Sequence, residues 1–201
     1  MKREIVSVNQ QVCPRIAGID EVGRGALFGP VVAAAVMLDS EVEVSLAEIG
    51  VRDSKCLKAR QREALVEPIK KHASSFAIGM ASVHEIDRLN ILRASLLAMR
   101  RAVNRLNAQP TLCLVDGNQK IPGLQIPQET IVKGDETNTA IAAASILAKV
   151  WRDALIVRLD QRYPGYDLAS NKGYGSPRHR QAITRLGLSP QHRKSFRKCR
   201  N

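Results

Sequence analysis

The chain has 201 residues, which fits a single domain, and 44% of them are hydrophobic, which is enough to bury a core. Its 31 Lys and Arg residues outnumber 19 Asp and Glu residues and give a formal net charge of +12, so nucleic acid is the natural partner, with solubility alone as the simpler explanation. The longest mostly apolar run, residues 26–38, is interrupted by Gly29 and Pro30 and is too short to span a bilayer, which excludes a membrane helix at this position.

The N-terminal segment and the cysteines indicate the compartment. The segment MKREIVSVNQQ contains neither an apolar stretch nor a small-residue cleavage site, so we expect a cytoplasmic protein rather than a secreted one. The four cysteines are far apart and form no C-x-x-C pair, which predicts reduced thiols instead of a disulfide framework or a zinc site. They are Cys13, Cys56, Cys113 and Cys199.

Five segments carry the signals of β-strands. Residues 15–20 and 30–38 predict two strands that a glycine-rich turn joins into a hairpin, and residues 76–82 predict a third strand. Residues 112–115 and 130–132 predict two shorter strands, each followed directly by turn residues.

Helical periodicity is found between the third and fourth strands, where apolar residues recur three or four apart. These apolar positions are Leu92, Leu96, Met99, Val103 and Leu106. Four arginines fall largely elsewhere around the same helix, and we expect a solvated face from Arg93, Arg100, Arg101 and Arg105. A second long helix is predicted over residues 139–162, nearly all apolar through Ala148, so its first half should be deeply buried before Pro164 and Gly165 end it.

The chain from Tyr166 onward is polar and basic, with a helical signal at residues 177–186 and a basic end, HRKSFRKCRN. The complete pattern predicts an α/β fold with a mixed central sheet flanked by helices. We expect this core over residues 1–165, and a C-terminal helical, basic, substrate-binding region of the same domain over residues 166–201.

Acidic residues follow three of the predicted strands. Asp20 and Glu21 come at the end of the first, Asp116 at the end of the fourth, and Asp135 after the fifth, so one edge of the sheet is expected to gather all four. Two charges ~5 Å apart repel by roughly 3 kcal/mol at an effective dielectric of about 20, so the cluster requires cations. Oxygen ligands favour Mg²⁺ or Mn²⁺, and a pair of such ions activates water and stabilises a leaving oxygen in phosphodiester cleavage.

An ordered series of motifs resembles ribonuclease HII. The motifs are GIDEVGRG at residues 18–25, DSK at 53–55, VDG at 115–117, KGD at 133–135, AAASILAKVWRD at 142–153, KGYG at 172–175, His179, and HRKSF at 192–196. The resemblance covers residues 16–196, and several motifs in family-like order are more specific than any one of them.

The resemblance implies a ribonuclease H-like fold and an endonuclease that cuts the RNA strand of RNA/DNA hybrids. It also implies incision on the 5′ side of a single ribonucleotide in duplex DNA, leaving a 3′-hydroxyl and a 5′-phosphate, which starts the removal of misincorporated ribonucleotides. Matched residue by residue, the catalytic and metal-binding acids of the family are Asp20, Glu21, Asp116 and Asp135. Two Mg²⁺ or Mn²⁺ ions are the implied cofactors.

Substrate recognition is implied at two further motifs. Main-chain groups of Gly23, Arg24 and Gly25 match those that bond the 2′-hydroxyl in the family, and glycine permits the close backbone approach this needs. Tyr174 matches the tyrosine that packs against the deoxyribose after the ribonucleotide. Phosphate contacts are expected from Ser54, Lys55, Lys172 and Arg193, with His179 as a further candidate.

The chain departs from the usual family pattern at four positions: Ala26, Phe28, Cys56 and Asn171. None of them is a predicted metal ligand, and we expect Phe28 to pack under the glycine turn. Ribonuclease HIII, a related group, typically carries an extra N-terminal domain and lacks this GRG form.

Two other functional classes are compared with a nuclease. A dinucleotide-dependent oxidoreductase is disfavoured, because Gly23, Gly25 and Gly29 are spaced one residue too widely and the neighbouring acids would repel a pyrophosphate. A non-catalytic nucleic-acid-binding protein would account for the net charge but gives no reason to gather four acids. We expect a monomer, with a replication or repair partner left open.

Overall fold

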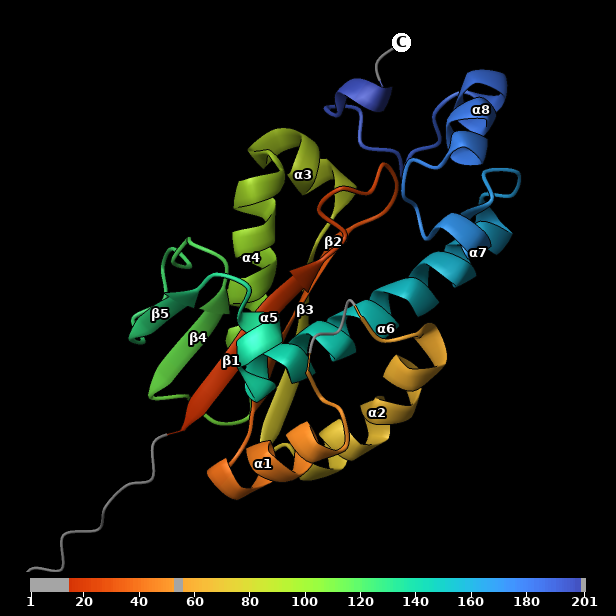
Figure 1. Ribbon diagram of the computed structural model, residues 1–201. Coiled ribbons are helices and arrows are strands. Elements are labelled where there is room, and N and C mark those ends of the chain that lie inside the picture. The colour runs from red at the N-terminus through yellow and green to blue at the C-terminus, as the bar shows by residue number, and fades with distance from the viewer. Residues whose placement is uncertain (1–14, 53–55, 200–201) are drawn as a thin grey trace, which may run out of the picture.

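The computed structural model describes residues 15–52 and 56–199, and its centre is a five-stranded mixed sheet (Figure 1). The strands are β1 (Ile16–Val22), β2 (Val31–Met37), β3 (Ser75–Ala81), β4 (Leu112–Asp116) and β5 (Gln128–Ile131). They lie in the order β3-β2-β1-β4-β5, in which β1, β2 and β3 form an antiparallel meander and β4 and β5 run parallel to β1. The predicted α/β fold with a mixed sheet is confirmed.

Helices surround this sheet in the described part of the chain. They are α1 (Ser40–Glu48), α2 (Ala59–His72), α3 (Val83–Leu89), α4 (Ile91–Val103), α5 (Gly134–Thr137), α6 (Thr139–Arg162), α7 (Leu168–Asn171) and α8 (Pro177–Leu186), followed by a 3₁₀ turn at Arg197–Cys199. The helices α4, α6 and α8 are predicted from periodicity, whereas α1, α2 and α3 are not. None of these helices combines the length and the apolar character needed to cross a membrane.

The unpredicted helix α3 has a clear local signal. Ser82 accepts a hydrogen bond from the Glu85 amide, and the Glu85 carboxylate accepts one from the Ser82 amide, so the two residues form a capping box. This S-x-x-E pattern stands in the sequence and marks the helix start. The helices α1 and α2 are harder to predict, because each buries only one or two residues.

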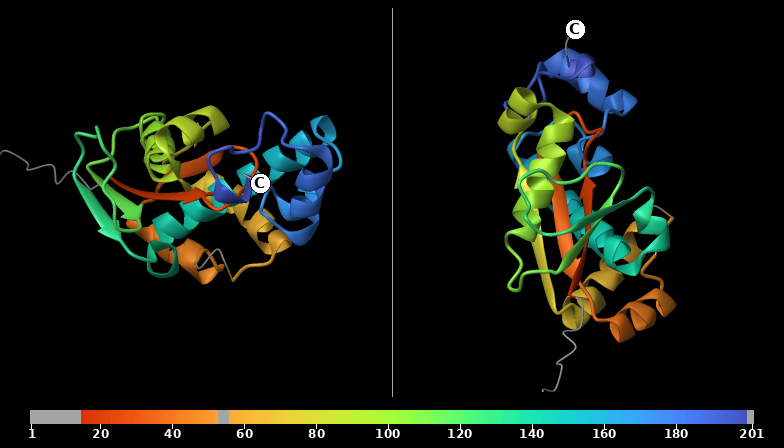
Figure 2. Two further views of the ribbon diagram at one scale, coloured as in Figure 1. Left: turned by 90° about the horizontal axis from the view of Figure 1, so that it is seen from above. Right: turned by 90° about the vertical axis from the view of Figure 1, so that its left-hand side faces the viewer.

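Two helical layers cover the two faces of the sheet, with α3 and α4 on one face and α1, α2 and α6 on the other (Figure 2). The strand β2 contributes side chains to the apolar clusters on both faces, because successive side chains of a strand point to opposite faces of the sheet. Val31 and Ala33 pack in the cluster with α4, while Val32 and Ala34 pack in the cluster with α6. A sheet covered on both faces explains why β2 is an unbroken apolar run.

The helix α6 lies directly against β1. Its residues 140–148 are all buried, as predicted for the first half of this helix. The approach is close because Gly18 has no side chain: a Cβ atom there would lie 2.2 Å from the carbonyl carbon of Ala140. Contact between the backbones of β1 and α6 therefore depends on this glycine.

The helix α4 differs from its prediction in two ways. Leu92 is 40% exposed, whereas Met99 and Val103 are buried as predicted, together with small residues such as Ala98. The solvated arginine face is confirmed for Arg105, which is exposed just past the end of α4 and bonds a β3 carbonyl at 2.9 Å. Arg101 differs, because it is partly buried in a two-pronged ion pair with Glu85 at 2.7 and 3.0 Å. The guanidinium groups reach back over the sheet edge because arginine is long enough to do so.

A third apolar cluster joins the C-terminal segment to the rest of the fold. It contains Phe28, Ile156, Tyr166, Leu168 and Ala182. The side chain of Phe28 is fully buried, which confirms that it packs under the glycine turn. The C-terminal helices therefore lie against α6 and the loop that follows β1, at the upper end of the molecule in Figure 1.

The cysteines of the described residues are free thiols, as predicted. Cys113 and Cys199 are buried and Cys56 is exposed, while Cys13 lies outside the described residues. Burial raises the pKa of the Cys113 thiol to about 11, so this group stays protonated and unreactive at neutral pH.

Candidate active site

The C-terminal ends of β1 and β4 lie side by side because the two strands are parallel. Asp20 and Glu21 lie within β1 rather than at its end, since β1 continues to Val22 while it pairs with β2. Asp116 is the last residue of β4. These three acids line an open pocket of about 520 Å³, together with the loop after β1 and residues of α2, α6 and the segment that contains Tyr174.

Asp20 is nearly buried, with 5% of its surface exposed. Its Oδ1 accepts a hydrogen bond from the Glu21 amide at 2.7 Å, and the Ser145 side chain on α6 also bonds the carboxylate. Burial raises the pKa of Asp20 well above its usual range, the charges of Glu21 and Asp116 raise it further, and the Ser145 bond opposes the rise. The ionised site is therefore costly without a cation.

Glu21 has a partner on the following turn. The Arg24 guanidinium, which is half exposed, lies 3.1 Å from Glu21 Oε1. Burial raises the pKa of Glu21, and the Arg24 charge and hydrogen bond counteract part of that increase. The side chain of Arg24 thus orients one of the acids.

Asp116 and Asp135 are linked through the first turn of α5. Asp116 Oδ1 accepts a hydrogen bond from the Gly134 amide at 2.7 Å, and Asp135 is the next residue. Asp135 is fully buried and is not among the residues that line the pocket. The structure thus brings three of the four predicted acids to the pocket surface and places the fourth in the interior.

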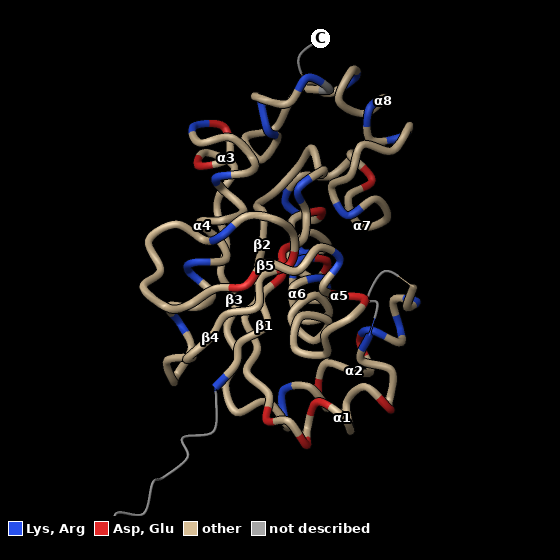
Figure 3. Tube along the Cα trace, turned by 60° about the vertical axis from the view of Figure 1, so that its left-hand side comes forward, with Lys and Arg blue, Asp and Glu red and all other residues tan. Residues whose placement is uncertain are grey.

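The donor chemistry of this pocket fits a hard divalent cation. In residues 15–52 and 56–199, no three Asp, Glu, His or Cys side chains are arranged as a ready-made metal site. The acids at the pocket nevertheless offer only oxygen atoms. Burial first, and the charges of Glu21 and Asp116 after it, raise the pKa of Asp20, and a bound cation would offset both costs. Figure 3 shows acidic positions where the strand ends meet α5 and α6, with basic positions on α2 and α8.

The glycine turn forms one wall of the pocket. Gly23 has a φ of +92°, and a Cβ atom there would lie 2.2 Å from Arg152 Nε, so the position requires glycine. Gly25 has no positive φ and no atom within 4 Å of its ideal Cβ position. The turn therefore presents its main chain to the pocket at Gly25 without a side chain in the way.

Tyr174 lies on the same pocket as the acids and the turn. Its ring centroid is 5.6 Å from Lys149 Nζ and 5.5 Å from Arg152 Cζ. A short β-bridge pairs Tyr174 with Ala26, which connects the C-terminal segment to the glycine turn. The structure thus brings together the two segments that the resemblance assigns to sugar recognition.

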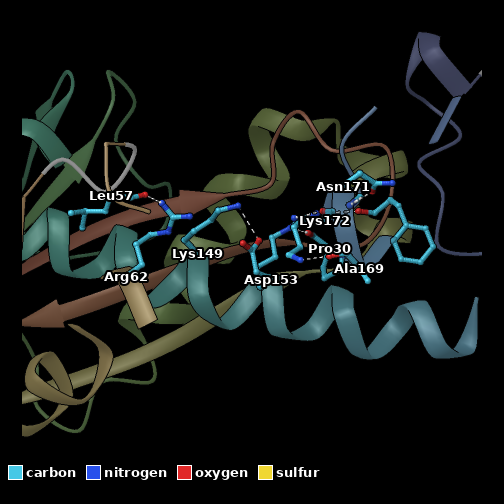
Figure 4. Close-up of polar contacts among 11 residues, drawn as sticks. Pro30, Leu57, Arg62, Lys149, Asp153, Ala169, Asn171 and Lys172 are labelled. Carbon is cyan, nitrogen blue, oxygen red and sulfur yellow. Dashed lines mark hydrogen bonds and ion pairs between the residues drawn. The ribbon is translucent and has the colours of Figure 1, made fainter. Parts of the chain in front are cut away.

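Two basic residues of the pocket are absent from the sequence-based prediction. Arg62 of α2 bonds the Leu57 carbonyl, and Lys149 of α6 lies 2.9 Å from Asp153 Oδ1 (Figure 4). Lys149 is found one helical turn after Ser145, so helical spacing from a single pocket residue identifies it. Arg62 gives no such signal, because α2 is far from the acids in the sequence.

The expected phosphate contacts have different outcomes. Arg193 and His179 are fully buried, so neither can touch phosphate directly in this structure, and both predictions are wrong on this point. Lys172 lines a neighbouring hollow that also includes Arg62, and its amine bonds the Ala169 carbonyl. Ser54 and Lys55 lie outside the described residues.

His179 and His192 form a buried relay with a single proton arrangement. The Ser189 amide donates to His192 Nδ1 at 2.9 Å, so a neutral His192 carries its proton on Nε2. That proton points to His179 Nε2 at 3.1 Å, and His179 Nδ1 in turn donates to the Tyr174 carbonyl at 2.8 Å. The exposed His72 and His84 match the surface position predicted for them.

Acid is expected to destabilise the protein through this relay. Burial, with the neighbouring His179 as the second cause, lowers the pKa of His192 to about 4, so the unfolded chain binds more protons between pH 4 and about 6.5. Stability is full above about pH 6.5 and falls on acidification, by on the order of 2 to 3 kcal/mol at pH 4. Urea unfolding from pH 7 to 4 measures this loss.

The matched controls for this prediction are His192→Gln and His72→Gln. The first removes the titrating ring, so most of the acid-dependent loss should disappear, whereas the second changes an exposed ring and should behave as the parent. An unchanged pH dependence in His192→Gln would contradict the assignment.

Comparisons with known proteins agree with this geometry. The ribonuclease HII family profile matches residues 17–199. Ribonuclease HII of Acaryochloris marina is 65% identical over 92% of this chain and 93% of its own length, and that of Trichodesmium erythraeum is 62% identical over 91% and 87%.

Solved structures share the fold. Ribonuclease H2 from Pyrococcus horikoshii superposes with a TM-score of 0.78 at 28% identity, over 92% of this chain and 95% of that one. Bst-RNase HIII in complex with Mn²⁺ has a TM-score of 0.72 at 20% identity, over 94% of this chain and 69% of that one. The sheet, the profile and the close relatives lead to one conclusion: this chain belongs to the ribonuclease HII family, has a ribonuclease H-like fold and is a nuclease of the hydrolase class.

Proposed function

We propose that this protein is an endoribonuclease that hydrolyses the RNA strand of RNA/DNA hybrids and incises 5′ to single ribonucleotides in duplex DNA. The products are a 3′-hydroxyl and a 5′-phosphate, and the role is removal of misincorporated ribonucleotides in the cytoplasm. Residues 166–201 form the substrate-binding part of the same domain. The proposal is supported by one observation above all: the acids, the glycine turn and Tyr174 line one pocket.

The proposed cofactors are two Mg²⁺ or Mn²⁺ ions held by the acids Asp20, Glu21, Asp116 and Asp135. Such ions, when bound, supply the positive charge that activates water and stabilises the leaving oxygen. The Mn²⁺ complex of Bst-RNase HIII supports this choice for a protein of the same fold. Asp135, which is buried in α5 next to Gly134, would complete this set of oxygen ligands.

The chain's own residues bind and orient the substrate in this mechanism. Ser145 holds the carboxylate of Asp20 in place, and Arg24 does the same for Glu21. The half-buried amine of Lys149, which lines the pocket and pairs with Asp153, provides positive charge for a phosphate. The turn bonds the 2′-hydroxyl through its main chain, and the Tyr174 ring packs on the next deoxyribose, where a hydroxyl would not fit.

The first test is cleavage of an end-labelled DNA duplex with one ribonucleotide, beside an all-DNA duplex and an RNA/DNA hybrid. We expect a single cut 5′ to the ribonucleotide with Mg²⁺ or Mn²⁺, cutting of the hybrid, and no cutting of DNA or in chelator. Binding without cutting would instead support a nucleic-acid-binding protein. Cutting of the hybrid alone would remove the proposed roles of the turn and Tyr174.

Substitution Gly25→Ala is expected to separate activity from stability. The added methyl group meets no atom within 4 Å, so the free energy of unfolding should change by no more than about 0.5 kcal/mol. The methyl projects where the sugar approaches, so kcat/KM on the single-ribonucleotide duplex should fall by about tenfold or more. Urea unfolding and initial rates measure both effects, and a variant with full activity would contradict the role of the turn.

The PCNA complex of RNase HII from Archaeoglobus fulgidus supports a further possibility for this chain. We propose that a replication or repair partner recruits it to newly made DNA. A pull-down with the tagged full-length protein from replicating cells, repeated after nuclease treatment, tests whether such a partner binds without nucleic acid.

A further inference from the structure

Two arginines are fully buried beside the active-site pocket. Arg152 of α6 and Arg193 of the C-terminal segment are 0% exposed and are among the largest fully buried side chains of the described residues. Neither lies within 4 Å of a carboxylate in residues 15–52 and 56–199. Burial, with the neighbouring charge of Arg152 as a second cause, lowers the pKa of Arg193 to about 9, so the group is still charged at neutral pH.

The hydrogen bonds of both guanidinium groups converge on the loop over residues 23–30. Arg193 donates to the carbonyl of Arg24 at 2.9 Å and to that of Gly29 at 3.0 Å. Arg152 donates to the carbonyls of Phe28 and Pro30, both at 3.1 Å. Two buried guanidinium groups therefore bind main-chain oxygens at both ends of this loop, at Arg24 and at residues 28–30.

Arg152 also reaches the segment that contains Tyr174. It donates to the Lys172 carbonyl at 2.9 Å, and its Cζ atom lies 5.5 Å from the centroid of the Tyr174 ring. A Cβ atom added to Gly23 would meet the same guanidinium. One side chain thus contacts both segments that the proposed function assigns to sugar reading.

The bond from Arg193 to Arg24 sets the direction of a specific amide. In a trans peptide the carbonyl of one residue and the amide N–H of the next point in opposite directions, and no peptide of the described chain is cis. The Arg24 carbonyl is directed at the buried Arg193, so the N–H of Gly25 is directed away from it. Gly25 lines the pocket, so its N–H is presented there as a donor for a substrate oxygen.

A purely structural role explains this arrangement poorly. Two like charges buried side by side are unfavourable, and apolar side chains of similar volume would fill the space at lower cost. The planar, five-donor fork of arginine does what no apolar residue can, since it fixes several carbonyls at set angles. Both side chains are also too buried to touch substrate.

We propose that Arg152 and Arg193 are positioning residues for substrate discrimination. Arg193 fixes the Arg24–Gly25 peptide so that the Gly25 amide meets the 2′-hydroxyl. Arg152 locks the turn to the Tyr174 segment, so that the ribonucleotide and the following sugar are read as one unit. This inference rests on the proposed function and adds the residues that set its specificity.

The test uses Arg152→Lys and Arg193→Lys, which keep the charge but lose the fork, with Arg162→Met as control because Arg162 is an exposed residue of the same helix α6 as Arg152. Rates are measured on the single-ribonucleotide duplex and on the long hybrid, well below each variant's Tm. Arg193→Lys should lower kcat about 30-fold on both substrates with little change in KM. Arg152→Lys should lower the ratio of kcat/KM, single ribonucleotide over hybrid, about tenfold.

Folded variants with the parent's kcat and the parent's substrate ratio would overturn the proposal. Because the rates are measured well below each variant's Tm, a loss of stability does not account for a lower kcat. A parent protein that cuts neither substrate would instead reject the proposed function. If the variants do not fold, ¹⁵N-glycine-labelled parent protein is titrated in chelator with duplexes that do or do not contain one ribonucleotide. The Gly25 amide resonance should shift only with the ribonucleotide, and equal shifts with both duplexes would refute the assignment.

Discussion

Replacement of Asp20 by asparagine is expected to lower the cleavage rate by about 10³-fold or more while the protein stays folded. Asparagine keeps the shape of the side chain but removes the charge that would hold a cation, and the lost electrostatic stabilisation is worth several kcal/mol, at about 1.4 kcal/mol for each factor of ten. Single-turnover cleavage of the single-ribonucleotide duplex measures the loss. The control is Glu129→Gln, an exposed acid of β5.

The same substitution should raise stability at neutral pH. Burial and the charges of Glu21 and Asp116 raise the pKa of Asp20 in the folded state, so ionised Asp20 opposes folding. We expect Asp20→Asn to be more stable than the parent at pH 7. The gain should shrink as the pH falls through the raised pKa, because the parent then protonates. Retained activity, or lower stability at pH 7, would contradict a strained cation site.

Substitution Gly18→Ala is expected to destabilise the fold by about 3 kcal/mol or more. The added Cβ atom would lie 2.2 Å from the carbonyl carbon of Ala140 and 2.3 Å from the amide nitrogen of Ile141. These are backbone atoms at the start of α6, so no side-chain rotation relieves the clash. The helix must shift, and Ser145 moves with it away from Asp20.

Urea unfolding measures this effect through the midpoint, with Gly25→Ala as the matched control because its methyl group meets no neighbour. The midpoint should fall strongly in Gly18→Ala and stay near the parent value in Gly25→Ala. Equal midpoints in the two variants would show that α6 does not pack on β1 as closely as the structure indicates.

The sheet was predictable because its strands combine apolar runs with turn residues. The run of β2 and the alternating pattern of β3 are visible without any tertiary information. The positions of the three acids at the pocket, Asp20, Glu21 and Asp116, were predictable for the same reason, since each follows such a run. The helices α1 and α2 were missed because few of their residues are buried, which leaves little periodicity.

The surroundings of the site were less predictable because they depend on distant segments. Arg193 and His179 are polar residue types that are mostly exposed, and a basic C-terminal segment suggests contact with phosphate. Their burial is possible because carbonyls of the loop after β1 accept hydrogen bonds from Arg193, and because His192 donates a hydrogen bond to His179. Neither neighbour follows from local sequence, and the burial of Asp135 likewise depends on how α5 packs.

The mixed topology of the sheet has a consequence for the order of events during synthesis. The meander of β1, β2 and β3 pairs neighbours in the sequence, so it is able to form soon after it leaves the ribosome. The acid pocket also requires β4, which pairs with β1 but follows α4 in the sequence. It requires α6 as well, which is made later still. A nascent chain therefore carries the first half of its fold without a complete catalytic centre, and cleavage becomes possible only when most of the polypeptide has been made.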